Sequence, residues 1–253
     1  MKNGIVVSLN ISKEKGTIKH SVPEVFINDQ GIEGDSHAGN WHRQVSLLSS
    51  ERIDEFSKEM NKKIGYGEFA ENITVSGLNL STVSLFDKFV IGDVQLEVTQ
   101  IGKKCHGDGC AIFKEIGKCV MPHEGIFCRV IKTGKVKIND IVKLKSSKLK
   151  TLVITSSDRA SKGEYKDISG PTIVEMLNCF CKSKPLSLEI EHIILPDDYN
   201  ELKPTIEKAV ANKYAFIFIT GGTGISPRDV TPEVLDTVIE KKLDGLMNFI
   251  KIK

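Results

Sequence analysis

The chain has 253 residues, which is enough for one large domain or two ordinary ones. Its net charge of +2 is too small to predict nucleic acid as a partner, and no apolar run approaches the length of a membrane span. The N-terminus lacks the pattern of a signal peptide, so the six cysteines are expected to be thiols of a cytoplasmic protein rather than disulfides.

Short runs of β-branched and aromatic residues separated by turns dominate the first half. The predicted strands are Ile5–Ile11, Val22–Ile27, Val45–Leu48, Phe89–Ile91, Val94–Ile101, Ile126–Ile131, Val136–Ile138 and Ile141–Leu144. Hairpin turns are expected at the pairs Gly92-Asp93, Thr133-Gly134 and Asn139-Asp140. One helix is predicted after Ser50, with Ile53, Phe56 and Met60 on one face. Many short strands with regular turns predict a mainly β, barrel-like domain.

Three loops of this half concentrate reactive side chains, although each taken alone is as readily plain solvated surface. The loop 31–43 holds Asp35, His37, His42, Arg43 and the only tryptophan of the chain. The loop 65–72 holds Glu68, Glu71 and Asn72. The loop 103–110 sets Cys105 beside two lysines and His106. Because neighbouring cations favour the thiolate, Cys105 is the candidate to bind a metal or carry sulfur.

A zinc or iron site is an alternative use of the cysteines and histidines in this region. Its candidate ligands are Cys105, His106, Cys110, Cys119, His123 and Cys128. Their spacing matches no common structural zinc motif. The competing interpretation is that Cys119 and Cys128 are small buried apolar residues, and the position of Cys128 inside a predicted strand favours burial.

The lysine-rich segment 143–150 predicts a domain boundary, which divides the chain into domains 1–146 and 147–253. After it, strands and helices alternate. The predicted strands are Thr151–Thr155, Leu188–Leu195 and Tyr214–Thr220, the last of them buried on both faces. The predicted helices begin near Pro171, end near Asn212, and begin at Thr231 with Thr231 as N-cap; the last carries Val234, Leu235, Val238, Ile239 and Leu243 on its apolar face. Three such units predict a parallel sheet with its ligand site at the carboxyl ends of the strands.

The stretch 219–233, ITGGTGISPRDVTPE, predicts an anion cradle at the third strand end. Gly221, Gly222 and Gly224 let the backbone approach a ligand closely, and the N–H groups of such a turn favour phosphate. Arg228 can clamp a phosphate with two hydrogen bonds, and Asp229 can hold Mg²⁺.

Carboxylates also follow the second strand, at Asp197 and Asp198. Asp198 precedes a helix and is expected to be its N-cap. Asp197 has no such role, so Asp197 and Asp229 together are candidates to hold Mg²⁺ against phosphates.

The first half resembles the MOSC domain, named for the C-terminal domain of molybdenum cofactor sulfurase. The motifs that carry this resemblance are GIEGDSHAG, HRQVSLL, GEFAENI, LEVTQIGKKCH, EGIFCRVI and KINDIVKL, which span about Gly4 to Lys145. The resemblance implies a largely β barrel in which Cys105 binds molybdenum or carries sulfur.

The second half resembles the molybdopterin-binding, adenylyltransferase-like family of molybdenum cofactor biosynthesis. The motifs are SDRASKGEYKDISGP, LPDD and TGGTG followed by PRDVTPE. The resemblance implies transfer of AMP from Mg-ATP to the phosphate of molybdopterin, with Asp197 and Asp229 as the catalytic, magnesium-binding acids. It assigns cofactor binding to the residues Ser157, Asp158, Arg159, Gly221, Gly222, Thr223, Gly224 and Arg228. Further strands and a helix follow the equivalent of Lys253 in the family, so an incomplete domain is expected.

Three functions follow from these patterns. The first is a two-domain α/β protein that binds molybdenum or sulfur through Cys105 and adenylylates molybdopterin. The second is a molybdenum or sulfur carrier whose second domain has no transferase activity. The third is a metal-binding regulatory module built on Cys105, Cys110, Cys119 and His123. The partners expected are molybdopterin and ATP, with a homo-oligomer or other molybdenum cofactor biosynthesis proteins left open.

Overall fold

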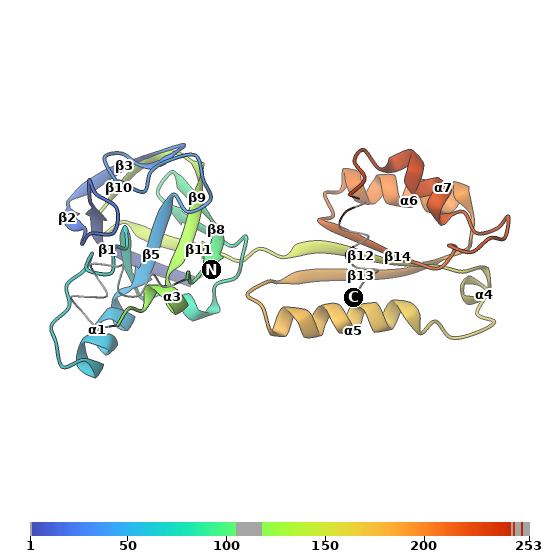
Figure 1. Cartoon of the computed structure of the whole chain (residues 1–253), viewed down its shortest axis with the longest axis horizontal. Helices are drawn as coiled ribbons and strands as arrows, with labels where there is room; N and C mark the ends of the chain where they lie inside the picture. The colour runs from blue at the N-terminus through green and yellow to red at the C-terminus, as the bar shows by residue number, and fades with distance from the viewer. Residues whose placement is uncertain (1, 105–117, 244, 246–248, 250–253) are drawn as a thin grey trace. The chain divides into compact units, whose positions relative to one another are not determined.

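The computed structural model of the protein describes residues 2–104, 118–243, 245 and 249 (Figure 1). The chain forms two compact units. The first, here called the N-terminal unit, contains Met1–Ser147 and Pro185–Ser187, and the second, the C-terminal unit, contains Lys148–Lys184 and Leu188–Lys253.

Seven strands of the N-terminal unit close into a barrel (Figure 1). Around the ring their order is β11, β7, β8, β9, β5, β6 and β1, and β1 pairs with β11 to complete it. All neighbours are antiparallel except β5 and β6, which are parallel. The strands are β1 (Lys2–Ile11), β5 (Val45–Ser49), β6 (Ile73–Ser76), β7 (Lys88–Ile91), β8 (Val94–Ile101), β9 (Ile126–Lys132) and β11 (Ile141–Lys145). The predicted barrel-like β domain is confirmed.

Alternating side chains fill the interior of this barrel. In β8, Val94, Leu96 and Val98 are fully buried, and in β7 Phe89 and Ile91 are fully buried. Successive residues of a strand point to opposite faces, so one residue in two enters the core. Burying an aliphatic or phenylalanine side chain stabilises a fold by about 1.5–3 kcal/mol. Closure of the ring also pairs both edges of its strands, which removes a site of aggregation.

The N-terminal unit has a second, three-stranded sheet, which is formed by β10 (Gly134–Lys137), β3 (Glu24–Asn28) and β4 (Gly31–Ile32) in that order. Two predicted hairpins are wrong here, because β10 pairs with β3 whereas β11 pairs with β1 and β7. Gly92-Asp93 does join the antiparallel strands β7 and β8. The predicted strand Val22–Ile27 is divided at Pro23, which has no N–H to donate, into β2 (His20–Val22) and β3.

Helix α1 (Ser50–Glu59) closes a second apolar cluster of this unit, which β9 also lines. Ser49 is its N-cap and accepts a hydrogen bond of 3.2 Å from the Arg52 N–H. Ile53 and Phe56 are buried as predicted, and the rings of Phe56 and Phe69 pack edge to face with their centres 5.4 Å apart. Two short helices, η1 (Leu80–Thr82) and α3 (Met121–Glu124), complete the unit as the structure describes it.

The C-terminal unit is a parallel sheet between helices (Figure 1). Its strand order is β13 (Leu188–Leu195), β12 (Leu149–Ser156) and β14 (Phe216–Thr220). Helix α5 (Ser169–Lys182) covers one face, and α6 (Tyr199–Ala211) and α7 (Thr231–Val238) cover the other. A short helix, α4 (Asp158–Ser161), follows β12. The predicted parallel α/β domain is confirmed.

Two details of this unit differ from the sequence prediction. Strand β14 was expected to be buried on both faces, but Phe216 and Phe218 are 43% and 37% exposed because α5 packs on β12 and β13 instead. Helix α7 has Val230 as its N-cap and already includes Thr231, and it ends at Val238, before the last two residues of the predicted apolar stripe.

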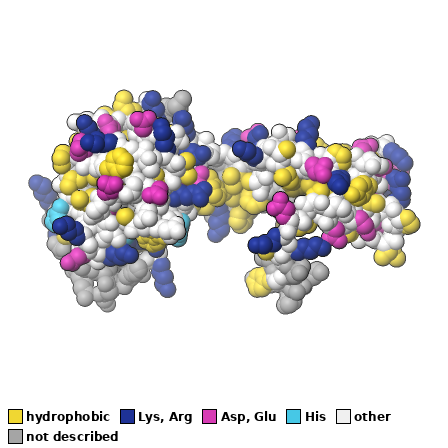
Figure 2. Space-filling view, turned by 90° about the horizontal axis from the view of Figure 1, so that it is seen from above, with side chains coloured by type: hydrophobic (Ala, Val, Ile, Leu, Met, Phe, Trp, Pro, Cys, Tyr) yellow, Lys and Arg dark blue, Asp and Glu magenta, His cyan; other side chains and the backbone are white. Residues whose placement is uncertain are grey.

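The surface carries both signs of charge. Figure 2 shows lysine and arginine side chains interspersed with aspartate and glutamate on the face drawn, which agrees with the small net charge. In the described part of the chain, every helix is too short or too polar to cross a membrane.

Candidate functional site

The carboxyl ends of the three parallel strands form the candidate site of the C-terminal unit. In the register of the sheet, Ser156 of β12 lies beside Leu195 of β13, and Thr155 lies beside Thr220 of β14. The Ser157 N–H donates to the Leu195 carbonyl oxygen at 2.8 Å, which ties the first two loops together. The loops after these strands carry the predicted site residues, as parallel topology requires.

Asp197 is held at the centre of the site by the end of β12. Its Oδ1 accepts a hydrogen bond from the Ser156 hydroxyl at 2.8 Å, and its Oδ2 accepts one from the Asp158 N–H at 3.0 Å. In return the Asp197 N–H donates to Asp158 Oδ1 at 3.2 Å. These bonds fix the carboxylate of Asp197 and leave further lone pairs on both oxygens for a cation.

Arg228 reaches across to the first loop and forms a two-pronged ion pair with Asp158. Its Nε lies 3.0 Å from Asp158 Oδ2 and its Nη2 lies 2.7 Å from Oδ1. The hydrogen bond and charge of Arg228 lower the pKa of Asp158, and Asp158 in turn raises the pKa of Arg228. The Arg228 side chain is 61% exposed, so solvent can reach the ion pair.

The glycine turn after β14 has no room for side chains. Gly221 and Gly222 have φ of +91° and +60°, in the left-handed region. A Cβ on Gly221 would lie 2.0 Å from the Ser156 carbonyl oxygen, and one on Gly222 would lie 2.5 Å from Thr231 Oγ1 and 3.0 Å from Asp197 Oδ1. The Thr231 hydroxyl donates to the Gly221 carbonyl oxygen at 3.0 Å and anchors the turn to α7. The backbone here forms a close-fitting cradle.

The remaining predicted residues lie around this centre. Ser157 caps α4 by accepting from the Ala160 N–H, and Arg159 lies over the ring of Tyr165. Thr223 and Gly224 are exposed.

The contacts of Asp229 lie within its own loop. Asp229 Oδ2 accepts from the Ser226 N–H at 2.9 Å, whereas Asp197 bonds to the first loop. Ser156 was not predicted as a site residue, because the strand was expected to end at Thr155, whereas β12 ends at Ser156. The N-cap role of Asp198 is confirmed.

A buried polar cluster lies beside the site, under α5. Thr155 Oγ1 donates to Asp167 Oδ2 at 2.8 Å, and His192 Nε2 lies 3.1 Å from the same oxygen. Burial alone would raise the pKa of Asp167, but the hydrogen bonds from Thr155 and the Gly170 N–H outweigh it and lower the pKa. Gly170 is enclosed by these groups, since its Cβ would meet all three side chains within 2.7 Å. The cluster joins α5 to the sheet.

The predicted sulfur or molybdenum ligand Cys105 lies outside the described residues, as do His106 and Cys110. Cys128 is fully buried in β9, and burial raises the pKa of its thiol far above the ordinary value, so the predicted burial is confirmed. Cys119 is partly buried against the α1 cluster. Within residues 2–104, 118–243, 245 and 249, no three histidine, cysteine or acidic side chains are placed to share a metal ion.

The loop 31–43 of the N-terminal unit is built on a buried ion pair. Lys19 Nζ lies 2.6 Å from Asp35 Oδ2, and the two side chains are 0% and 1% exposed. Asp35 also accepts from the N–H groups of Ser12 at 3.1 Å and His37 at 3.0 Å. Burial lowers the pKa of Lys19 even with Asp35 beside it. Asp35 was flagged from the sequence, but nothing in the sequence marked Lys19.

Glu71 predicts a pH dependence of the stability of this unit. It is fully buried, its Oε2 has no hydrogen-bond partner, and burial raises its pKa from 4.5 to about 7. As the pH rises, the Glu71 carboxyl loses its proton at a lower pH in the unfolded chain than in the folded one. The free energy of unfolding should therefore fall between about pH 4.5 and pH 7, by on the order of 3 kcal/mol. In Glu71→Gln this fall should be absent, as urea unfolding at pH 5 and pH 8 would show. An equal fall in both proteins would contradict it.

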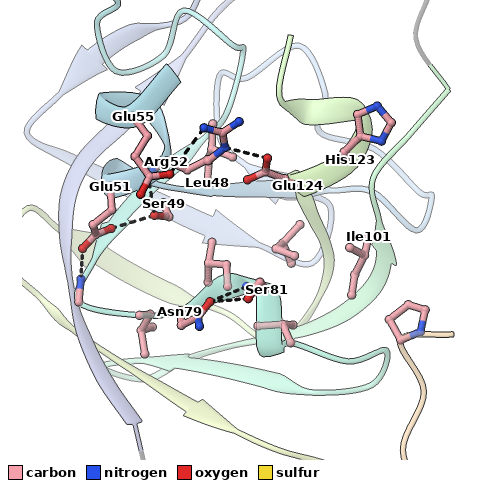
Figure 3. A pocket seen from close by; sticks show the side chains of 16 residues that line it. Leu48, Ser49, Glu51, Arg52, Glu55, Asn79, Ser81, Ile101, His123 and Glu124 are labelled. Atoms are coloured by element: carbon pink, nitrogen blue, oxygen red, sulfur yellow. Dashed lines mark hydrogen bonds and ion pairs between the residues drawn. The ribbon is translucent and has the colours of Figure 1, made fainter. Parts of the chain in front are cut away.

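The N-terminal unit also contains a cavity of about 660 Å³ between α1 and the barrel (Figure 3). It is lined by apolar residues such as Leu48 and Ile101 and by the charged residues Glu51, Arg52, Glu55 and Glu124. Arg52 bonds to Glu124 and Glu59 at 2.7 and 2.8 Å. Of these two partners only Glu124 lines the cavity with Arg52, and the pattern of the sequence did not predict the cavity.

Comparison with known proteins assigns both units. Residues 34–143 match the MOSC domain, and residues 152–252 match the probable molybdopterin binding domain. The two resemblances predicted from the sequence, to the MOSC domain in the first half and to the molybdopterin-binding family in the second, are therefore confirmed.

Individual relatives support the same assignment. The molybdopterin adenylyltransferase of Pyrococcus furiosus is 37% identical over 91 residues, which cover 36% of this chain and 50% of that protein. Gephyrin of Dictyostelium discoideum is 34% identical over 99 residues, which cover 37% of this chain and 14% of gephyrin. The match thus spans half or less of these relatives. The crystal structure of the YUAD protein from Bacillus subtilis superposes with a TM-score of 0.50 at 19% identity, over 58% of this chain and 97% of that one, and shows the barrel fold alone.

Proposed function

We propose that the C-terminal unit binds molybdopterin and transfers AMP to it from Mg-ATP. The observation that carries this proposal is the Gly222 cradle, in which backbone without room for a side chain lies against Ser156, Asp197 and Thr231. It lies at the strand ends where parallel sheets bind ligands. The match to the probable molybdopterin binding domain and the likeness to a molybdopterin adenylyltransferase support the choice of ligand.

The residues of the site fit the parts of this reaction. The N–H groups of the turn at Gly221–Gly224 suit phosphate oxygens, and Arg228 can offer the guanidinium N–H groups that Asp158 does not engage. Asp197 and Asp229 supply the carboxylate oxygens that Mg²⁺ prefers. The transfer forms a bond between a phosphate oxygen of molybdopterin and the α-phosphorus of ATP, and it breaks the bond to pyrophosphate. The protein contributes to such a step by positioning the two substrates and by neutralising the charge of their phosphates.

For the N-terminal unit we propose that Cys105 binds molybdenum or carries sulfur. The match to the MOSC family and the lysines beside this cysteine in the sequence support the proposal.

Asp197→Asn should reduce adenylyl transfer about 100-fold or more, because the neutral amide removes charge that a metal ion needs. The measurement is the transfer of label from α-labelled ATP to molybdopterin by the full chain. Asp198→Asn is the matched control, because Asn caps a helix as well as Asp and this carboxylate caps α6. Equal loss in both variants, or none in Asp197→Asn, would contradict the assigned role.

Binding without transfer is the second candidate function. It is favoured by the position of Asp229, whose carboxylate accepts from the Ser226 N–H of its own loop, whereas the carboxylate of Asp197 bonds to Ser156. If the chain retains molybdopterin in gel filtration but transfers no label, the C-terminal unit is a binding domain, and the carrier role then rests on Cys105.

A further inference from the structure

The cavity between α1 and the barrel is lined by charged side chains from two helices and by apolar side chains from the rest of the N-terminal unit (Figure 3). The titratable residues come from α1 and α3 and are Glu51, Arg52, Glu55, His123 and Glu124. The apolar residues come from three barrel strands and the segment 77–83 and are Leu48, Leu78, Leu80, Val83, Ile101 and Ile126. The volume of about 660 Å³ is within the range of pockets that bind small organic molecules.

Negative charge is in excess among the described residues that line this cavity. The lining holds three carboxylates, those of Glu51, Glu55 and Glu124, against the guanidinium of Arg52. A proton on His123 would still leave one carboxylate of the lining without a matching positive charge. A cleft lined mainly by one sign of charge attracts ligands of the opposite sign. The cavity therefore favours a positively charged occupant.

Glu51 is held in its anionic form by uncharged groups. It accepts hydrogen bonds from the hydroxyls of Ser49 and Ser76, at 2.8 and 2.9 Å, and from the Gly77 N–H at 2.7 Å. Burial alone would raise the pKa of Glu51, but these hydrogen bonds outweigh it and lower the pKa to about 2. None of the three donors carries a positive charge, so the negative charge of Glu51 remains available to a ligand.

We propose that this cavity binds a small organic cation, in which an ammonium or guanidinium group is carried on an apolar body. The carboxylates can accept charge-assisted hydrogen bonds from the cationic group, and the leucine and isoleucine side chains can cover the apolar body. Glu55 is suited to this contact, because its side chain is 66% exposed and its Oε2 lies 3.6 Å from Arg52 Nη1, too far for a hydrogen bond.

The proposed site is separate from the functions proposed above. Among the described residues, none that lines the cavity belongs to the loops 31–43 and 65–72 or to the C-terminal unit. Binding of an organic cation therefore does not depend on Cys105 or on adenylyl transfer.

Phenylpropylamine, phenylpropanol and phenylpropionate test the proposal, because they share one apolar body and differ in the charge of its end group. Binding of each compound to the full chain would be measured by calorimetric titration at neutral pH and constant ionic strength. We expect saturable binding of the amine, binding of the alcohol that is weaker by about tenfold, and no binding of the carboxylate. Ser81→Arg should abolish binding of the amine, because Ser81 is an exposed residue of the lining and arginine there would supply the missing positive charge.

Two glutamates of α1 form a matched pair of variants. Glu55→Gln should weaken binding of the amine about fivefold, as expected for an exposed ion pair. Glu59→Gln is the control, because Glu59 is also exposed and bonds to Arg52 at 2.8 Å but does not line the cavity. Its affinity for the amine should stay within about twofold of that of the native chain.

Three results would overturn the proposal. The first is that none of the compounds binds, and the second is that the alcohol or the carboxylate binds as tightly as the amine. The third is that Ser81→Arg and Glu55→Gln, shown to be folded by circular dichroism, bind the amine as tightly as Glu59→Gln does, because the amine would then bind elsewhere on the chain.

Discussion

Asp35→Asn is expected to lower the free energy of unfolding of the N-terminal unit by about 3–5 kcal/mol, because it leaves the buried ammonium of Lys19 without its counter-charge. Both side chains of the pair are at most 1% exposed, so water cannot replace the lost partner. Asparagine keeps an acceptor oxygen for only one of the Ser12 and His37 N–H groups, because these groups donate to different oxygens of Asp35, so part of the loss comes from a broken hydrogen bond. Urea unfolding followed by the fluorescence of Trp41 measures this loss of free energy.

The double variant Lys19→Met with Asp35→Asn is the control for this prediction. Removing both charges should recover most of the loss, because a buried ion pair is often no more stabilising than apolar groups of similar size. A double variant as unstable as the single one would show that packing or hydrogen bonding at Asp35, and not charge, holds the loop 31–43.

Gly221→Ala is expected to destabilise the C-terminal unit by about 3 kcal/mol and to abolish ligand binding at the cradle. The new methyl group would lie 2.0 Å from the Ser156 carbonyl oxygen, so the turn must move away from β12. Thermal unfolding and molybdopterin retention would be measured together on the full chain.

Gly163→Ala is the control for Gly221→Ala, because it measures the cost of a positive φ in alanine without a steric clash. Gly163 also has a positive φ, +73°, but no atom lies within 4 Å of the position of its Cβ. We expect Gly163→Ala to cost only about 1 kcal/mol and to leave binding intact. If both variants lose the same stability and both still bind, the close approach of the turn to β12 has no functional role.

The sequence predicted a barrel-like β domain but not the strand pairing that closes the barrel. Alternation of apolar residues identified most of its strands, since one face of each is buried. Strand β6, Ile73–Ser76, was missed. The pairing that closes the ring joins Ile5 to Ile141, and no local pattern can encode such a distant partner. The two wrong hairpins have the same cause, because turn residues do not determine which strands pair.

The candidate site was predictable where local chemistry decides it. Glycines at positive φ, the cap at Asp198 and the acidic loops all follow from neighbouring residues. The pair of Asp158 with Arg228 does not, because 70 positions separate the two side chains and only the parallel sheet brings them together. Lys19 was missed for a related reason. A lysine is expected at the surface, and its burial depends on the ion pair with Asp35, which the sequence does not show.

Release of pyrophosphate from Mg-ATP by the full chain, with and without molybdopterin, tests the central claim most directly. We expect release that requires molybdopterin and that disappears in Gly221→Ala and Asp197→Asn but persists in Gly163→Ala and Asp198→Asn. Absence of release from the folded native chain, or release that Asp197→Asn leaves unchanged, would contradict adenylyl transfer at the strand ends.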